Sequence, residues 1–329
     1  MKDLLHHIKL VRPLNLVIIA LTMYAMRYGI IYPMVIETND LGLTLQLPHW
    51  EFILSVLVMV FLAAAGNIIN DYFDVKVDRI NKPDKILVGR VVKRRVAMVL
   101  HWLFNGFACT IGLFLAWRHD LMILAAIPFF MAGSLWYYSF LFKKQLLIGN
   151  VVVALMVAIV PLWAGLFDLK ALALAYGDQI SNLSQFMGSI WMWLLGFSFF
   201  AFLTTLIREA QKDLQDQKGD AAGRFRTLPI VYGRSIAKAY VLTLNALLVL
   251  LVIAIGFRII PWGESPMTKV LLYALLVVIP SLLSWVITFK ANDEDDYGRA
   301  SLMSKLVMLG GILFTPVIWL LIREATLMG

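Results

Sequence analysis

The stretch FILSVLVMVFLAAAGNIINDYFDVKVDRINKPDK, residues 52–85, decides the fold. It opens on an apolar run about as long as the ~20 residues that cross a bilayer as a helix. It then places Asp71, Asp74 and Asp78 where that helix ends. Neighbouring carboxylates repel one another, and the negative end of the helix dipole adds to this cost. The stretch therefore predicts a membrane helix whose acidic end faces something positive.

The rest of the chain continues the apolar pattern. Of its 329 residues, 61% are hydrophobic and only 15% are charged, with a mean hydropathy of +0.81. A soluble domain carries more charge than this. Because the alternation of barrel strands is absent, we predict an all-α polytopic membrane protein with nine transmembrane helices in a bundle, forming one domain over residues 1–329. The predicted spans are about 15–36, 52–75, 92–117, 120–142, 147–167, 190–211, 236–257, 268–289 and 302–322.

Basic residues predict the orientation of the bundle. With these spans, 23 of the 29 Lys and Arg residues fall on the side that holds the N-terminus and the loops after the second, fourth, sixth and eighth helices. The positive-inside rule places that side in the cytoplasm and the C-terminus outside. The net charge of +8 therefore indicates anionic lipid or substrate as the partner, not nucleic acid. Arg27 lies near the outer end of its span, where a long side chain can reach the interface.

The acidic spacing occurs twice. Asp213, Asp216 and Asp220 repeat the pattern D-x-x-D-x-x-x-D of the first patch, at the end of the sixth predicted span. We therefore expect two related halves, with motifs at 67–85 and 208–229 and a site between them. On a continuous helix, offsets of 0, 3 and 7 share one face, so each set of three carboxylates is expected to point into a common pocket.

The residue types in these patches favour a hard cation. Oxygen ligands without Cys or His select Mg²⁺ over Zn²⁺, and Mg²⁺ commonly bridges a few carboxylates to the phosphates of a substrate. Cations near both patches could stabilise charge on a departing diphosphate: Arg79, Lys82, Arg90, Arg208, Lys212, Arg224 and Arg226. A bundle interior rich in apolar side chains could hold an isoprenoid tail, and aromatic faces such as Tyr72, Tyr137 and Tyr138 could stabilise an allylic carbocation.

These motifs resemble a known family. Asn70-Asp71-x-x-Asp74-x-x-x-Asp78 is similar to the first signature of the UbiA superfamily of intramembrane prenyltransferases, and Asp216-x-x-x-Asp220 to the second. The resemblance implies Mg²⁺, a polyprenyl diphosphate donor and transfer of the prenyl group to an acceptor. It implies Mg²⁺–diphosphate binding by Asn70, Asp74, Asp78, Asp216 and Asp220.

We therefore expect two sets of site residues. The catalytic set is Asn70, Asp71, Asp74, Asp78, Asp213, Asp216 and Asp220. The substrate-binding set is Arg12, Asn15, Asn67, Arg79, Lys82, Arg90, Tyr138, Lys143, Arg208, Lys212 and Arg226. Arg12 and Asn15 come from RPLN, which matches a cavity-lining start of the first helix. Tyr138 and Lys143 come from YSFLFK, which is similar to a tyrosine–lysine pair near the diphosphate.

The acceptor stays open at this stage. The two motif strings look most like the branch that makes ether lipids, typified by digeranylgeranylglyceryl phosphate synthase. The segment KILVGR at 85–90 and Gln211 both depart from the usual pattern of relatives, so aromatic acceptors of the quinone or chlorophyll type remain alternatives. Two rivals of another class are a cation-coupled secondary transporter and a lipid-binding scaffold without turnover.

Overall fold

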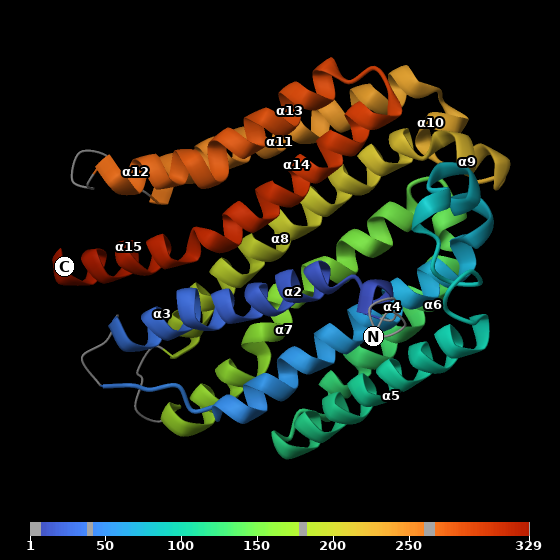
Figure 1. The fold of residues 1–329 in the computed structure, drawn as a ribbon. Coiled ribbons are helices and arrows are strands. Elements are labelled where there is room, and N and C mark those ends of the chain that lie inside the picture. Colours follow the sequence, from blue (N-terminus) through green and yellow to red (C-terminus); the bar gives the residue numbers. More distant parts are fainter. Residues whose placement is uncertain (1–7, 38–41, 178–182, 260–266, 329) are drawn as a thin grey trace.

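The fold is taken from a computed structural model, which describes residues 8–37, 42–177, 183–259 and 267–328. These residues form a helical bundle, with no β-strand in the described ranges (Figure 1). The α-helices are α2 (Pro13–Met26), α3 (Tyr32–Glu37), α4 (His49–Asn81), α5 (Arg94–Arg118), α6 (Ala126–Phe140), α7 (Ile148–Tyr176), α8 (Leu183–Gln215), α9 (Gln217–Ala222), α10 (Leu228–Val231), α11 (Arg234–Ile259), α12 (Met267–Tyr273), α13 (Ile279–Lys290), α14 (Glu294–Leu313) and α15 (Thr315–Met328). Short 3₁₀ or π segments are η1 (Arg27–Ile31), η2 (Pro83–Lys85), η3 (Met122–Ala125), η4 (Phe142–Lys144) and η5 (Ala274–Val278).

The predicted spans are confirmed by the helices. In the described part of the chain, nine helices are long and apolar enough to cross a membrane, and each overlaps a predicted window. The main difference is length, because α4 continues to Asn81 where the prediction stops at 75. The acidic patch of α4 therefore lies on a helical extension of the span, which keeps Asp71, Asp74 and Asp78 in helical register.

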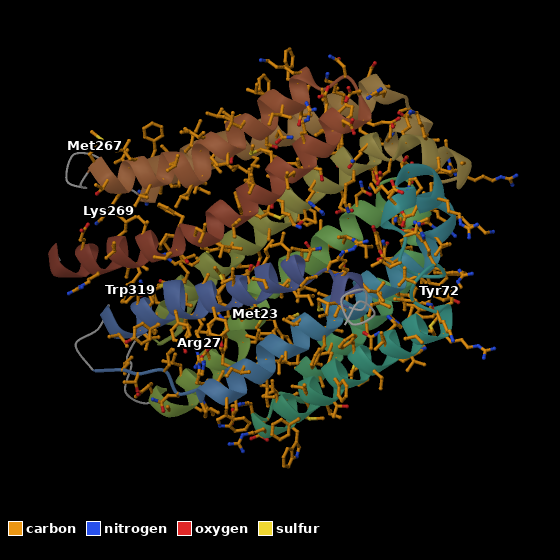
Figure 2. The ribbon with its side chains drawn as sticks, in the orientation of Figure 1. Met23, Arg27, Tyr72, Met267, Lys269 and Trp319 are labelled. Atoms are coloured by element: carbon orange, nitrogen blue, oxygen red, sulfur yellow. The ribbon has the colours of Figure 1, made fainter. Side chains whose placement is uncertain are left out.

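The packing order explains where a site can form. Helix α8 packs between α7 and α14, while α4 packs against α5 and α6. The ends of α4 and α8 and the short helix α9 come together at one end of the bundle, and α15 reaches the other end (Figure 1). Tyr72 of α4 marks the first end, and Met267 and Lys269 of α12 mark the second (Figure 2). The two acidic motifs, 142 positions apart in sequence, thus share one end of the molecule.

Arg27 differs from the sequence prediction. The Arg27 side chain, labelled in Figure 2, is 2% exposed. It forms an ion pair with Asp168 of α7, at 3.2 Å between Nη2 and Oδ1. The same nitrogen donates a hydrogen bond to the Leu47 carbonyl, and the guanidinium lies 4.4 Å from the ring centroid of Phe52. The prediction of a side chain that reaches the interface is wrong because Asp168, which is fully buried, gives the charge a partner inside the bundle.

Helix α14 approaches η5 closely at Gly310. A Cβ placed on Gly310 would overlap the backbone carbonyl oxygen of Leu276, which a flexible side chain cannot relieve. We expect Gly310→Ala to destabilise the protein by about 1–3 kcal/mol, the usual cost of overpacking. Thermal unfolding in detergent measures this.

The matched control is Gly133→Ala in α6, where a Cβ meets nothing within 4 Å. We expect that variant to keep or slightly raise the melting temperature, because alanine favours helix over glycine. Equal melting temperatures for Gly310→Ala and the unmodified protein would contradict the close packing of α14 on η5.

Candidate active site

A polar cavity of about 860 Å³ opens at the end of the bundle where α4 and α8 end. It is lined by side chains from both halves of the chain. The predicted site residues among its lining are Arg12, Asn70, Asp71, Asp74, Asp78, Lys82, Arg90, Lys143, Arg208, Lys212 and Asp216. The structure therefore brings the first acidic patch and Asp216 of the second into one pocket.

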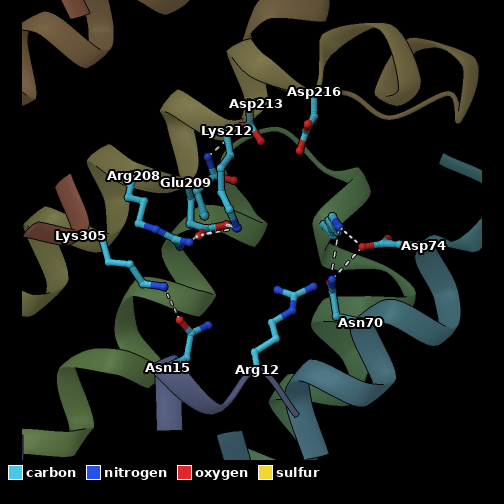
Figure 3. Close-up of polar contacts among 12 residues, drawn as sticks. Arg12, Asn15, Asn70, Asp74, Arg208, Glu209, Lys212, Asp213, Asp216 and Lys305 are labelled. Carbon is cyan, nitrogen blue, oxygen red and sulfur yellow. Dashed lines mark hydrogen bonds and ion pairs between the residues drawn. The ribbon is translucent and has the colours of Figure 1, made fainter. Parts of the chain in front are cut away.

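Asp74 is the most enclosed carboxylate of the first patch. It is 4% exposed, forms an ion pair with the Lys143 ammonium, and accepts a hydrogen bond from Asn70 Nδ2 at 2.7 Å (Figure 3). Burial opposes the charge of Lys143, but Asp74 and other neighbours outweigh burial and raise the pKa of Lys143 above its usual range. Asn70 lies one turn before Asp74, so helical spacing alone brings these two together. Lys143 comes from η4, so only the tertiary structure brings it to Asp74.

Asp71 faces the start of α2. Its carboxylate forms an ion pair with Arg12, which precedes Pro13 and adopts a left-handed backbone with φ 54° and ψ 67°. Non-glycine residues in this region cost about 1–3 kcal/mol and persist where their surroundings hold them. Here the Asp71 pair and a hydrogen bond from Arg12 N to Lys9 O, 3.1 Å, hold the turn. These contacts hold the Arg12 side chain at the cavity in spite of the strain.

The second patch departs from the predicted geometry. Helix α8 ends at Gln215 and α9 begins at Gln217, so Asp213, Asp216 and Asp220 do not share one continuous helical face. Asn81 of α4 links the break: its Nδ2 donates to the Asp216 carbonyl at 3.1 Å, and its Oδ1 accepts from Gly219 N at 2.8 Å. The single-helix prediction is wrong because this cross-link turns the chain after α8.

The three carboxylates of the second patch consequently have different surroundings. Asp216 lines the cavity and forms an ion pair with Lys82 of α4 at 2.8 Å. Asp213 instead accepts a hydrogen bond from Asn150 Nδ2 of α7 at 2.8 Å and does not line the cavity, so the prediction that it points into the same pocket is wrong. Asp220 is 5% exposed and, like Asp213, is not in the cavity lining, so of the second patch only Asp216 points into the predicted common pocket. Burial raises the pKa of Asp220 to about 7, with Asp216 and Asp74 adding to the shift and Lys143 opposing it.

Several predicted substrate contacts lie outside the cavity. Arg79, Arg224 and Arg226 are exposed and do not line it, so their contact with the diphosphate stays a prediction. Arg79 follows Asp78 directly, and neighbours on a helix point about 100° apart. Asn67 donates to the Val11 carbonyl at 2.9 Å, and Asn15 accepts from Lys305 at 2.5 Å; both support the wall near α2. Tyr138 is not in the lining, so its contact with the substrate stays a prediction.

Some residues at the site escaped the sequence analysis. Glu209 is 8% exposed and accepts hydrogen bonds from Arg208 at 2.7 Å and from Lys212 at 3.0 Å (Figure 3). Lys305 of α14 also lines the cavity. A charged residue inside an apolar helix indicates a functional site. Glu209 lies inside the predicted span 190–211, so the sequence could have identified it. Lys305 lies inside the predicted span 302–322 and gave the same signal, but its closeness to α2 and α8 arises only in the fold.

The donor set suits Mg²⁺ held together with a phosphate. Among the described residues, no three Asp, Glu, His or Cys side chains lie close enough to hold a metal ion by themselves. Mg²⁺ usually takes one or two protein carboxylates, with waters and substrate phosphates completing its octahedron. Asp74 and Asp216 each rest against a lysine, so a cation bound with a diphosphate could replace that lysine while the lysine contacts phosphate.

Comparisons with known proteins agree with this arrangement. The profile of the UbiA prenyltransferase family matches residues 41–309. The digeranylgeranylglyceryl phosphate synthase of Methanopyrus kandleri is 32% identical over 267 residues, covering 79% of this chain and 84% of that protein. The synthase of Methanothermobacter thermautotrophicus is 28% identical over 311 residues, covering 92% and 91%.

Solved structures share the fold. One from a study of digeranylgeranylglyceryl phosphate synthase in membranes superposes with a TM-score of 0.55 at 23% identity, covering 96% of this chain and 100% of that chain. A UbiA homologue from Archaeoglobus fulgidus, solved with DMAPP and Mg²⁺, gives 0.53 at 16% identity, covering 94% and 99%. The family match and the nine candidate spans of the described residues lead to one conclusion. The chain belongs to the UbiA prenyltransferase family and is an integral, multi-pass membrane enzyme.

Proposed function

We propose that the chain transfers a polyprenyl group from a prenyl diphosphate to a lipid acceptor that carries a glyceryl phosphate head, with Mg²⁺ as cofactor. The observation that carries this proposal is the cavity, where carboxylates of α4 and Asp216 of the α8–α9 break lie beside lysines and arginines. The relatives named digeranylgeranylglyceryl phosphate synthase support the acceptor class, and the homologue solved with DMAPP and Mg²⁺ supports the donor and the metal.

Each half of the cavity has a part in the proposed reaction. Asn70, Asp74, Asp78, Asp216 and Asp220 would hold Mg²⁺ with the diphosphate. When bound, Mg²⁺ would neutralise the charge that develops on the departing diphosphate. Lys143 and Lys82 lie against Asp74 and Asp216 and can add charge-assisted hydrogen bonds to the phosphate oxygens. In the reaction the allylic C–O bond breaks, the diphosphate leaves with the bonding electrons, and the acceptor hydroxyl oxygen bonds to the allylic carbon and loses its proton.

We also propose that the cavity opens to the cytoplasm and that the C-terminus lies outside. The cavity end carries the loops that hold most of the basic residues, and the positive-inside rule places such loops in the cytoplasm. A cavity that opens on this side would release the water-soluble diphosphate product into the cytoplasm.

The test is prenyl transfer by the purified protein with labelled geranylgeranyl diphosphate. We expect diphosphate release and one prenylated product with geranylgeranylglyceryl phosphate, loss of at least about 10²-fold of this rate after EDTA, and recovery on adding Mg²⁺. A panel of aromatic acceptors runs beside it. Transfer only to an aromatic acceptor would overturn the proposed acceptor class, and intact donor with every acceptor would overturn the proposed enzyme activity.

A further inference from the structure

Three cations lie on the side of the cavity away from Asp74, and a fourth, Arg12, lies between them and Asp74 (Figure 3). We call Arg12, Arg208, Lys212 and Lys305 the basic group; all four line the cavity. In Figure 3, Arg208, Lys212 and Lys305 lie on one side, Asn70 and Asp74 on the other, and Arg12 between them. The basic group comes from α8, α14 and the start of α2, whereas the lysines that pair with Asp74 and Asp216 come from η4 and the end of α4.

The basic group carries more positive charge than its neighbours neutralise. Arg12 pairs with Asp71, and Arg208 and Lys212 share one carboxylate, that of Glu209, so two carboxylates face four cations. Lys305 donates to the neutral amide oxygen of Asn15, and it forms no ion pair within the described part of the chain. Arg12 and Arg208 repel both Lys212 and Lys305. Half-buried like charges held this close are stabilised when an anion joins them.

Buried hydrogen bonds fix the position of two members of this group. Gln211 precedes Lys212 and Ser304 precedes Lys305, and the Ser304 hydroxyl donates to Gln211 Oε1 at 2.7 Å. Gln211 Nε2 in turn donates to Thr288 Oγ1 of α13 at 3.0 Å. Consecutive helical residues point about 100° apart, so this contact between α8 and α14 leaves both lysines free to face the cavity. Because Gln211 and Ser304 are almost fully buried, their pairing holds the register of the two helices.

The wall beside Lys305 also carries exposed apolar side chains. Leu302 lies one turn before Lys305 on α14, lines the cavity and is 60% exposed. Leu306, which follows Lys305, is 46% exposed. An anion on the basic group can therefore belong to a molecule whose apolar chain stays in the bilayer along α14.

We propose that the basic group binds the phosphate of the acceptor, in a subsite distinct from the one that holds the donor diphosphate. This inference rests on the proposed function, because it assumes a phosphate-bearing acceptor. It assigns Lys305 as a specificity-determining residue, and it makes Gln211 and Ser304 positioning residues for Lys212 and Lys305.

The experiment pairs a change in the protein with a change in the acceptor. The protein changes are Lys305→Gln and, as a second variant, Arg208→Gln. The acceptors are geranylgeranylglyceryl phosphate and the same lipid without its phosphate. We expect each variant to raise the KM for the phosphorylated acceptor about tenfold or more, the usual loss with a charge-assisted hydrogen bond. We expect the donor KM to change less than about twofold, and the loss of activity with the unphosphorylated acceptor to be several-fold smaller than the loss with the phosphorylated one.

The matched control is Arg299→Gln on the same helix. Arg299 is 73% exposed, pairs with Asp296 and does not line the cavity, so the same loss of charge leaves both KM values unchanged. A rise in the donor KM, or an equal loss with both acceptors, would overturn the separate subsite. An unchanged acceptor KM in both variants would overturn it as well.

A binding measurement separates this inference from the proposed function. Equilibrium binding of the two lipids is measured with the unmodified protein and with Lys305→Gln. If no acceptor is prenylated, the proposed function fails, yet tighter binding of the phosphorylated lipid that is lost in Lys305→Gln supports the subsite. Equal binding of the two lipids by the unmodified protein overturns the subsite even if transfer occurs.

Discussion

Asp74→Asn is expected to lower prenyl transfer by about 10²–10³-fold, the scale of losing one group that stabilises developing charge at an active site. Asp74 is the buried carboxylate at which α4, Asn70 and Lys143 meet. The amide keeps the size of the side chain but removes the negative charge that would hold Mg²⁺. It also leaves Lys143 without its ion-pair partner. Steady-state transfer at saturating Mg²⁺ and donor measures the loss.

The control for this change is Asp295→Asn, which removes one carboxylate from an exposed position at the start of α14. We expect this variant to keep the unmodified rate. Thermal unfolding of Asp74→Asn shows whether the loss comes from the site or from the fold. A folded Asp74→Asn protein that retains more than about a tenth of the rate would refute the proposed role of the first patch.

Arg27→Leu is expected to destabilise the protein by about 3–5 kcal/mol, because it leaves Asp168 as a buried charge without its partner. Asp168 is fully buried in α7, and the Arg27–Asp168 pair joins α7 to the junction of α2 and η1. Arg27 also contacts the Leu47 carbonyl and the Phe52 ring, so the fold loses packing as well. Thermal or denaturant unfolding in one detergent measures the change.

The double variant Arg27→Leu, Asp168→Leu tests the cause. Replacing a buried ion pair by apolar residues is often neutral, so we expect the double variant to recover much of the lost stability. The pair lies away from the cavity residues, so transfer by the folded fraction stays near that of the unmodified protein. If the double variant loses as much free energy of unfolding as the two single variants together, the two charges do not stabilise the fold as a pair.

The sequence by itself predicted the membrane bundle, because a span is a local property. About twenty consecutive apolar residues must satisfy their backbone as a helix in lipid, whatever lies beside them. The first acidic patch was predictable for the same reason, since Asn70, Asp71, Asp74 and Asp78 lie on one unbroken helix and i, i+4 spacing sets their common face. The relation of the two halves stays a prediction.

The tertiary structure alone decided which charges meet. The break after Gln215 depends on Asn81, which lies more than 130 positions earlier, and it separates Asp213 from Asp216. Arg27 became an internal ion pair only because α7 brings Asp168 beside it. Lys305 joined the cavity because α14 packs against α8 and α2. Helical periodicity gives the direction of a side chain about its own axis, but the rotation and register of packed helices determine its partner, and these depend on contacts far apart in the chain.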